Sequence, residues 1–426
     1  MERSPYPTPD DIIRSVGCLG ASNIDQCLLD TADTEFNKEE GEGPQDIERA
    51  FNCLRAILMR HWDNPAPEIQ KYVAAALMRR AQIFAHFREF DAARNDFAEV
   101  RGRYEHSRDI EVRRSVAAAF YEAGNMEEKL NNTDDAVEWY EAAIDLFGND
   151  DDDMIDIQVA DMRIDLAIIY FGREWRDLGS ELLDAGIRRW ESHVEYWLRR
   201  KVANMRMHRA LEAAYSAETV QEQESALSLL DEAIAYTDCA LGQFLHFIQG
   251  ACFAEKVKLL YKMDRCDDAI ECSEHFRERA IEELRDNPPN SKETVEQLQK
   301  HLRETALIAA HSHNFLDQSE LALIACDRTG ISNGDGEYTS VRDKEFAISA
   351  LSARTIALSR LHRFPQAKRC IFEIYKIAGP KVDDNWTTAM MISVGRALEI
   401  MTEEAQKAGL EFAVITIPAD DLPDPS

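Results

Sequence analysis

Two stretches of equal length, AQIFAHFREFDAARNDF at 81–97 and GNMEEKLNNTDDAVEWY at 124–140, carry the same pattern. Each begins with a small residue, has an alanine twelve positions later, and has a large aromatic residue four positions after that alanine. The apolar residues on both sides of the central break recur at three and four positions, which indicates helices. Small side chains let two helices approach closely while large neighbours fill the groove between them. Each stretch is therefore predicted to join two antiparallel helices.

The pattern recurs along the chain. The other clear copies are Ala214 with Ala226 and Leu230, and Thr355 with Ala367 and Ile371. In three weaker copies the register is open by one residue: Ala50 with Leu54, Leu178 with Leu182, and Ser319 with Leu323. Short breaks at 86–88, 131–132, 263–265 and 361–363 join antiparallel helices most simply. Alternating strand patterns are nearly absent, so the sequence predicts an all-α protein.

The phrases Phe90–Ala93 and Cys266–Ala269, each a bulky or apolar residue, a polar helix start and an alanine, resemble the opening of the second helix of a tetratricopeptide repeat. The best copies are 42 to 43 residues apart, longer than the common repeat of about 34. The resemblance implies a divergent tetratricopeptide-like α-solenoid of antiparallel helix pairs, wound as a right-handed superhelix. We expect a flexible tail at 1–20, a repeat domain at 21–410 with a capping helix at 385–408, and a second tail at 411–426, where three prolines and a strand-like run occur.

The chain is strongly acidic, with a formal charge of −30. This charge repels nucleic acids and anionic lipids and favours basic partners, although an acidic surface that only maintains solubility is the simpler interpretation. No stretch is apolar for long enough to cross a membrane, and the start lacks a secretory signal. We expect an intracellular, cytoplasmic protein without membrane contact, with the nucleus as an alternative. The nine cysteines, among them Cys53, Cys239 and Cys252, lack framework spacing and are expected to be reduced and buried.

Motifs of nucleotide hydrolysis, serine hydrolysis and zinc proteolysis are absent, so the sequence predicts no enzyme and no cofactor. Cys266, Cys272 and His275 lack an evident fourth ligand, and no metal site is expected. The acidic run Asn149–Asp153 precedes an amphipathic stretch and is interpreted as a helix cap, with contact to a basic ligand as the alternative. The basic stretch at 188–209 is expected to meet an acidic segment of a partner or of the chain itself.

The resemblance also implies where a partner binds, because the first helix of each tetratricopeptide pair lines the concave face. Counted from the matched small residues, the inward-facing polar positions are Arg79, Gln82, His86, Glu122, Asn125, Lys129, Glu255, Lys258 and Lys262. The Lys and Asn pair with which chaperone adaptors of this fold hold a C-terminal carboxylate is not reproduced. The sequence therefore favours a scaffold or adaptor that binds a peptide or helix of another protein, expected to be basic. A peptide-sensing regulator that controls an output partner is the alternative.

Overall fold

The computed structural model describes residues 8–18, 23–37, 46–241, 246–286, 292–331, 338, 340–378 and 387–408. Within these ranges all regular secondary structure is helical, as the sequence predicts. The chain forms two compact units, Met1–Met205 and Arg206–Ser426, where the sequence analysis expects one repeat domain at 21–410. The predicted right-handed superhelix stays a prediction.

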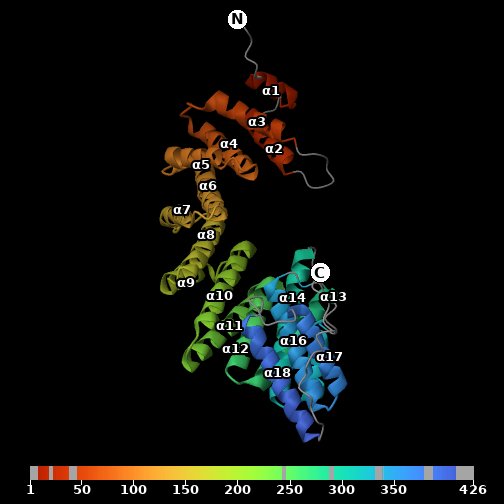
Figure 1. Cartoon of the computed structure of the whole chain (residues 1–426). Helices are drawn as coiled ribbons and strands as arrows, with labels where there is room; N and C mark the ends of the chain where they lie inside the picture. Colours follow the sequence, from red (N-terminus) through yellow and green to blue (C-terminus); the bar gives the residue numbers. More distant parts are fainter. Residues whose placement is uncertain are drawn as a thin grey trace. The chain divides into compact units, whose positions relative to one another are not determined.

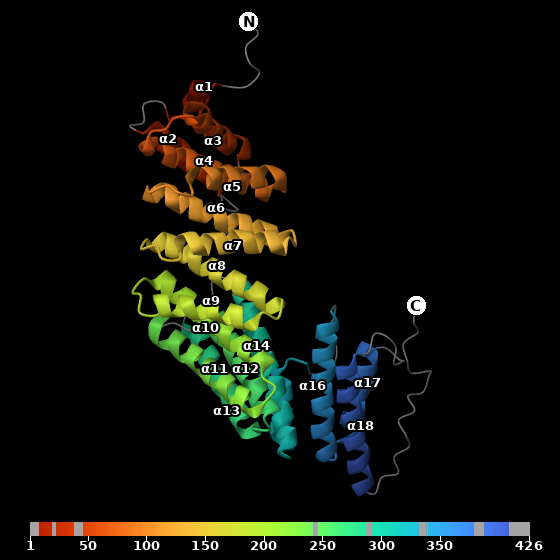
Figure 2. The same ribbon diagram turned by 90° about the vertical axis from the view of Figure 1, so that its left-hand side faces the viewer.

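The first unit holds nine helices and the start of a tenth within its described residues. They are α1 (Pro9–Ser15), α2 (Ile24–Phe36), α3 (Ile47–His61), α4 (Pro67–His86), α5 (Phe90–Tyr104), α6 (Ile110–Lys129), α7 (Thr133–Phe147), α8 (Asp153–Gly172), α9 (Arg176–Trp190) and α10 (Tyr196–Ser216). From α2 onward they form antiparallel pairs that follow one another as layers (Figures 1 and 2). The first helices α2, α4, α6 and α8 also pack on one another, so their side chains share one face of the unit.

The second unit repeats this plan. After the end of α10 its helices are α11 (Val220–Leu241), α12 (His246–Lys262), α13 (Cys266–Asp286), α14 (Lys292–Phe315), α15 (Ser319–Arg328), α16 (Val341–Arg360), α17 (Phe364–Ala378) and α18 (Thr388–Lys407). The first helices α12, α14 and α16 again contact one another, and α18 packs on α16. This last helix lies within the range 385–408 predicted for a capping helix.

The turns inside the pairs share one backbone geometry. Six of them contain a non-glycine residue with positive φ, two positions before the second helix: Arg88, Asn131, Glu174, Asp264, Asp317 and His362. The next backbone N–H then reaches back five residues, as from Asn132 to the carbonyl of Glu127 at 2.9 Å. This bond satisfies a carbonyl that the helix end leaves free. The predicted breaks at 86–88, 131–132, 263–265 and 361–363 are confirmed.

The small residues lie where the paired helices cross. Ala81, Ala93 and Ala136 are completely buried. At Gly124 a Cβ atom would lie 2.7 Å from two ring atoms of Tyr140, whose ring fills the space opposite. The pattern quoted at the start therefore marks the contact between α6 and α7, as predicted from residue size.

One of the weaker copies lies one residue further along, within the one residue left open for it, and another has a different register from the one predicted. In α9 the buried pair is Gly179 and Leu183, while Leu178 is 48% exposed. In α15 the corresponding pair is Ala322 and Cys326, three positions after Ser319 and Leu323. In both helices the correct small residue is the fourth of the helix, as in α3, α5 and α7, and sequence alone does not fix where the helix begins.

The N-terminal region differs from the predicted flexible tail. Helix α1 packs on α3, and its Ile12 and Ile13 are buried there.

The expectation that every cysteine is reduced is also wrong, because Cys18 and Cys27 form a disulfide bond between the end of α1 and α2. Their spacing of nine residues matches no framework, so the sequence does not reveal the bond. The free cysteines described are all buried, as expected, at Cys53, Cys252, Cys266, Cys272, Cys326 and Cys370. Cys239 and the predicted tail at 411–426 lie outside the described side chains.

Candidate partner-binding site

The nine predicted site residues all lie on first helices. Arg79, Gln82 and His86 belong to α4, while Glu122, Asn125 and Lys129 belong to α6. Glu255, Lys258 and Lys262 belong to α12 in the second unit. The prediction therefore places a group of six and a group of three on separate units, and each group has its own surroundings.

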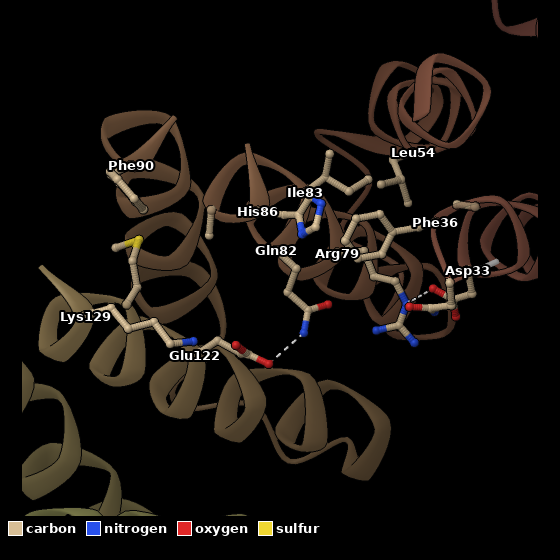
Figure 3. Close-up of a pocket in the computed structure, with 14 residues that line it drawn as sticks. Asp33, Phe36, Leu54, Arg79, Gln82, Ile83, His86, Phe90, Glu122 and Lys129 are labelled. Carbon is tan, nitrogen blue, oxygen red and sulfur yellow. Dashed lines mark hydrogen bonds and ion pairs between the residues drawn. The ribbon is translucent and has the colours of Figure 1, made fainter. Parts of the chain in front are cut away.

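A cavity of about 520 Å³ brings most of the first group together. It opens between α2, α3, α4, α5 and α6, and its lining includes Arg79, Gln82, His86, Glu122 and Lys129 (Figure 3). Asn125 is not part of the lining. The sequence analysis missed the contribution of α2, which comes before the first clear copy of the pattern and carries no quoted small residue.

Two polar contacts bridge neighbouring first helices across this cavity. Arg79 forms an ion pair with Asp33 of α2. The Gln82 Nε2 group donates a hydrogen bond to Glu122 Oε1 of α6 at 2.8 Å (Figure 3). These side chains hold α2, α4 and α6 in register, so a ligand would meet them as a preformed polar wall.

The lining also has an aromatic part. The His86 imidazole lies edge-on to the ring of Phe36, with the centroids 5.6 Å apart. Leu54, Ile83 and Met126 complete this apolar side. Half of the lining residues are polar or charged, so the cavity offers apolar contacts and directed polar groups side by side.

Two of the predicted residues keep unused polar groups beside the cavity. Within the described part of the chain, Lys129 has no ion-pair partner and Asn125 forms no hydrogen bond. Lys129 is exposed and Asn125 is half-buried on the same face of α6. An ammonium group and a primary amide in these positions can bind the carbonyl and amide groups of an extended peptide.

A group of carboxylates continues this face on α6 and α8. Glu128 accepts a hydrogen bond from the Tyr140 hydroxyl at 3.0 Å, and Asp161 pairs with Lys201 at 2.5 Å. Asp165 has no hydrogen bond or ion pair within the described residues. Burial, with the charges of Glu128 and Asp161, raises the pKa of Asp165 to about 7, although Lys201 opposes the shift. The sequence analysis did not single out these residues, because isolated acids on a helix resemble an ordinary solvated surface.

The three predicted residues of the second unit are engaged within it. Lys258 Nζ lies 3.2 Å from Glu255 and 3.6 Å from Glu304 of α14. Lys262 donates to the carbonyl of Ala217 at 2.8 Å, just beyond the end of α10. A cation suits a helix end, where carbonyl groups are left free. Lys262 therefore has a structural role in this unit.

The acidic run and the basic stretch are also used internally. Asp152 accepts backbone N–H bonds from Met154 and Ile155 at the start of α8, as the capping interpretation requires, and pairs with Arg114 at 2.7 Å. In the basic stretch, Arg189 pairs with Asp156 at 3.0 Å. The first ion pair joins two successive helix pairs, and the second joins the two helices of one pair.

Among the residues that the structure describes, no three His, Cys, Asp or Glu side chains are grouped so that they could hold a metal ion. None of the described helices has both the length and the apolar character needed to span a membrane.

Comparison with known proteins supports the fold. No protein-family model and no curated protein matches the chain. Among solved structures, the chain is similar to the crystal structure of the apo form of RapI, with 11% sequence identity over 91% of this chain and 99% of that one, and a TM-score of 0.52. Lower TM-scores, 0.35 and 0.22, relate it to a Rap protein complexed with competence and sporulation factor (11% identity, covering 94% and 93%) and to the tetratricopeptide domain of P58(IPK) (13%, covering 89% and 99%). The chain has a tetratricopeptide-like helical-repeat fold, and at this identity the likeness concerns the fold alone.

Proposed function

We propose that this chain is a non-catalytic scaffold or adaptor, and that an extended segment of a partner protein binds along the first helices of its first unit. The observation that carries the proposal is a preformed cavity beside α4 and α6, next to polar groups on α6 and α8 that have no partner among the described residues. Asn125 and Asp165 are both half-buried, so each offers polar atoms to which a bound partner can form hydrogen bonds.

The chemistry of the face indicates the kind of segment that fits. An apolar side chain would occupy the cavity beside Phe36 and His86. The peptide backbone would bond to Asn125, and a Lys or Arg side chain would approach Asp165. A positive charge there would favour the ionised carboxylate, which burial disfavours. The partner segment is thus expected to be basic with an apolar residue nearby.

Site-specific photo-crosslinking tests the proposal. A photoreactive residue at Asn125 should capture a partner from the native cell extract in a defined band, identified by mass spectrometry. The matched control is Asp145, an exposed residue on the second helix α7. If both positions capture the same proteins with equal yield, the first-helix face is not the binding surface.

A second measurement tests the charge of the partner. Replacing Asp165 by Asn keeps the size of the side chain and removes its charge, so it should weaken capture at Asn125 by about tenfold if a cation binds there. Unchanged capture would show that the Asp165 carboxylate does not contact the partner. That result would say nothing about the cavity. The peptide-sensing alternative requires a partner whose binding changes when a short peptide is added, and it stays a hypothesis.

A further inference from the structure

The first helices of the second unit enclose a groove that the proposed site in the first unit does not use. It has a volume of about 540 Å³ and is lined by α12, α14, α16 and α18. Its apolar wall includes Phe315 and Ile392, whose side chains are 52% and 66% exposed. Large apolar side chains left exposed around one concavity mark a surface on which another apolar group binds.

Two buried oxygen atoms in the lining lack hydrogen bonds. Asn314 and Ser352 are 5% and 1% exposed, and both line the groove. Asn314 Nδ2 donates to the carbonyl of Ala353 at 2.8 Å, which leaves Oδ1 as a free acceptor. Neither this Oδ1 nor the Ser352 hydroxyl has a partner in the described part of the chain. If the two side chains turned toward the groove, an occupant with both N–H and C=O groups, as a peptide backbone has, would satisfy the two atoms.

The groove is more basic than the rest of this acidic chain. Four cationic side chains line it, Lys258, Arg342, Arg360 and Arg396, against two carboxylates, Glu304 and Glu345. Lys258, Arg342 and Arg360 have acidic neighbours. Arg396 has no acidic neighbour among the described residues. Its charge acts to lower the pKa of both Tyr261 of α12 and His311 of α14, so the guanidinium group faces the groove. Apolar walls with a free cation suit an apolar segment that carries acidic residues.

The sequence that follows α18 has this composition. Residues 412–417 read FAVITI, Glu411 precedes them, and Asp420, Asp421 and Asp424 follow. We propose that this C-terminal segment, residues 410–424, binds in the second-unit groove of its own chain. The proposal does not depend on the partner assigned to the first unit.

The length and starting point of the segment fit the groove. The charges of Lys407, at the end of α18, and Arg360, at the end of α16, act on each other, so the segment begins at that end of the groove. The groove follows α16 from Arg360 back to Arg342, about 27 Å at the helical rise. About nine extended residues cover this distance. Residues 409–417 therefore reach from one end to the other, and the aspartates follow at Arg342, whose side chain is 73% exposed.

Photo-crosslinking in the full-length chain tests this inference. A benzophenone residue at Ile415 should crosslink within the same chain, and mass spectrometry should place the product on α14, α16 or α18 at groove residues such as Phe346 and Ile392. Crosslinks spread over other helices, or products of twice the chain mass, would overturn the proposal. The second result would identify the occupant as a segment of another copy.

Two variants of exposed residues on α18 provide a matched control. Ile392→Asp places a charge on the apolar wall and should reduce the crosslink by about tenfold. Met391→Asp changes an exposed neighbour that does not line the groove, and the crosslink should remain. Equal yields from the two variants would show that the groove does not hold the segment. Because both side chains are exposed, both proteins should fold, which the thermal transition would verify.

Discussion

Replacement of Gly124 by alanine tests the contact on which the fold depends. The added Cβ would lie 2.7 Å from the Cδ1 and Cζ atoms of Tyr140, about 1 Å closer than a normal carbon contact. Tyr140 cannot turn away easily, because its ring is completely buried and its hydroxyl bonds to Glu128. Overpacking of this kind costs about 1–3 kcal/mol. Alanine in a helix regains about 1 kcal/mol relative to glycine. We expect the free energy of unfolding to fall by about 1 kcal/mol, the middle of the range that these two contributions leave.

Urea unfolding followed by tryptophan fluorescence measures this change in the first unit, which contains five of the six tryptophans. Gly102→Ala in α5 is the control, since a Cβ there meets no atom within 4 Å, and it should stabilise the unit by up to about 1 kcal/mol. The loss from Gly124→Ala should shrink when Tyr140 is replaced by the smaller leucine. If Gly124→Ala matches the control, or its loss is the same beside leucine, the two helices do not cross at this glycine.

Three further changes have expected outcomes in the same assay. Asp165→Asn should raise the free energy of unfolding by about 2 kcal/mol above pH 7, about half of what the full pKa difference would give for this partly exposed group. The gain should fade as the pH drops from 7 to 4, because the folded carboxyl is protonated there and ionisation in the unfolded chain matters less; a gain independent of pH would refute the raised pKa. Glu127→Gln should lower the free energy of unfolding by about 2 kcal/mol at pH 7, because the buried carboxylate accepts two hydrogen bonds from Arg94, at 2.7 and 2.9 Å. If stability does not fall, this ion pair is not formed. Arg88→Gly should add about 0.5 kcal/mol by relieving a positive φ, whereas Asn131→Gly should change little because asparagine tolerates that conformation; equal effects would contradict this account.

The helix pairs could be predicted because their determinants are local. Three features lie next to one another in the sequence: the turn, the start of the second helix, and an alanine at the fourth position of that helix. The pattern at Phe90–Ala93 can therefore be recognised without a structure. The register failed by three residues in α15, because Ser319 and Ala322 are both small and the sequence does not fix where the helix begins. In α9 the buried Gly179 lies one position after Leu178, within the one residue left open for that copy. Helix α1 was missed because its seven residues are too few to show a helical period.

The site could be predicted only in part, for a different reason. Periodicity assigns a residue to a helix face, so it placed Gln82 and Glu122 on first helices, but it does not show that the two side chains bond to each other. Lys262 lies on the predicted face and is nevertheless used by the carbonyl of Ala217. Asp33 contributes from a helix without the repeated pattern. Which polar groups remain unpaired depends on neighbours distant in sequence, and this decides which residues are available to a partner.

The carboxylates of this acidic chain can be divided into those that pair with a cation and those that do not. Asp152 pairs with Arg114 of the preceding helix pair, which lowers its pKa, so its ionisation stabilises the stack of pairs. Asp156 pairs with Arg189 of α9, although burial raises the pKa of Asp156. Asp165 lies on the same helix as Asp156, has no such partner, and carries a pKa of about 7 because its neighbours are themselves acidic. Ionisation of Asp165 destabilises the folded chain, so the packing of the helix pairs does not explain why an acidic residue occupies this position. A cation supplied from outside would reverse the sign of that contribution, and the first-helix face of the first unit is where we expect one to bind.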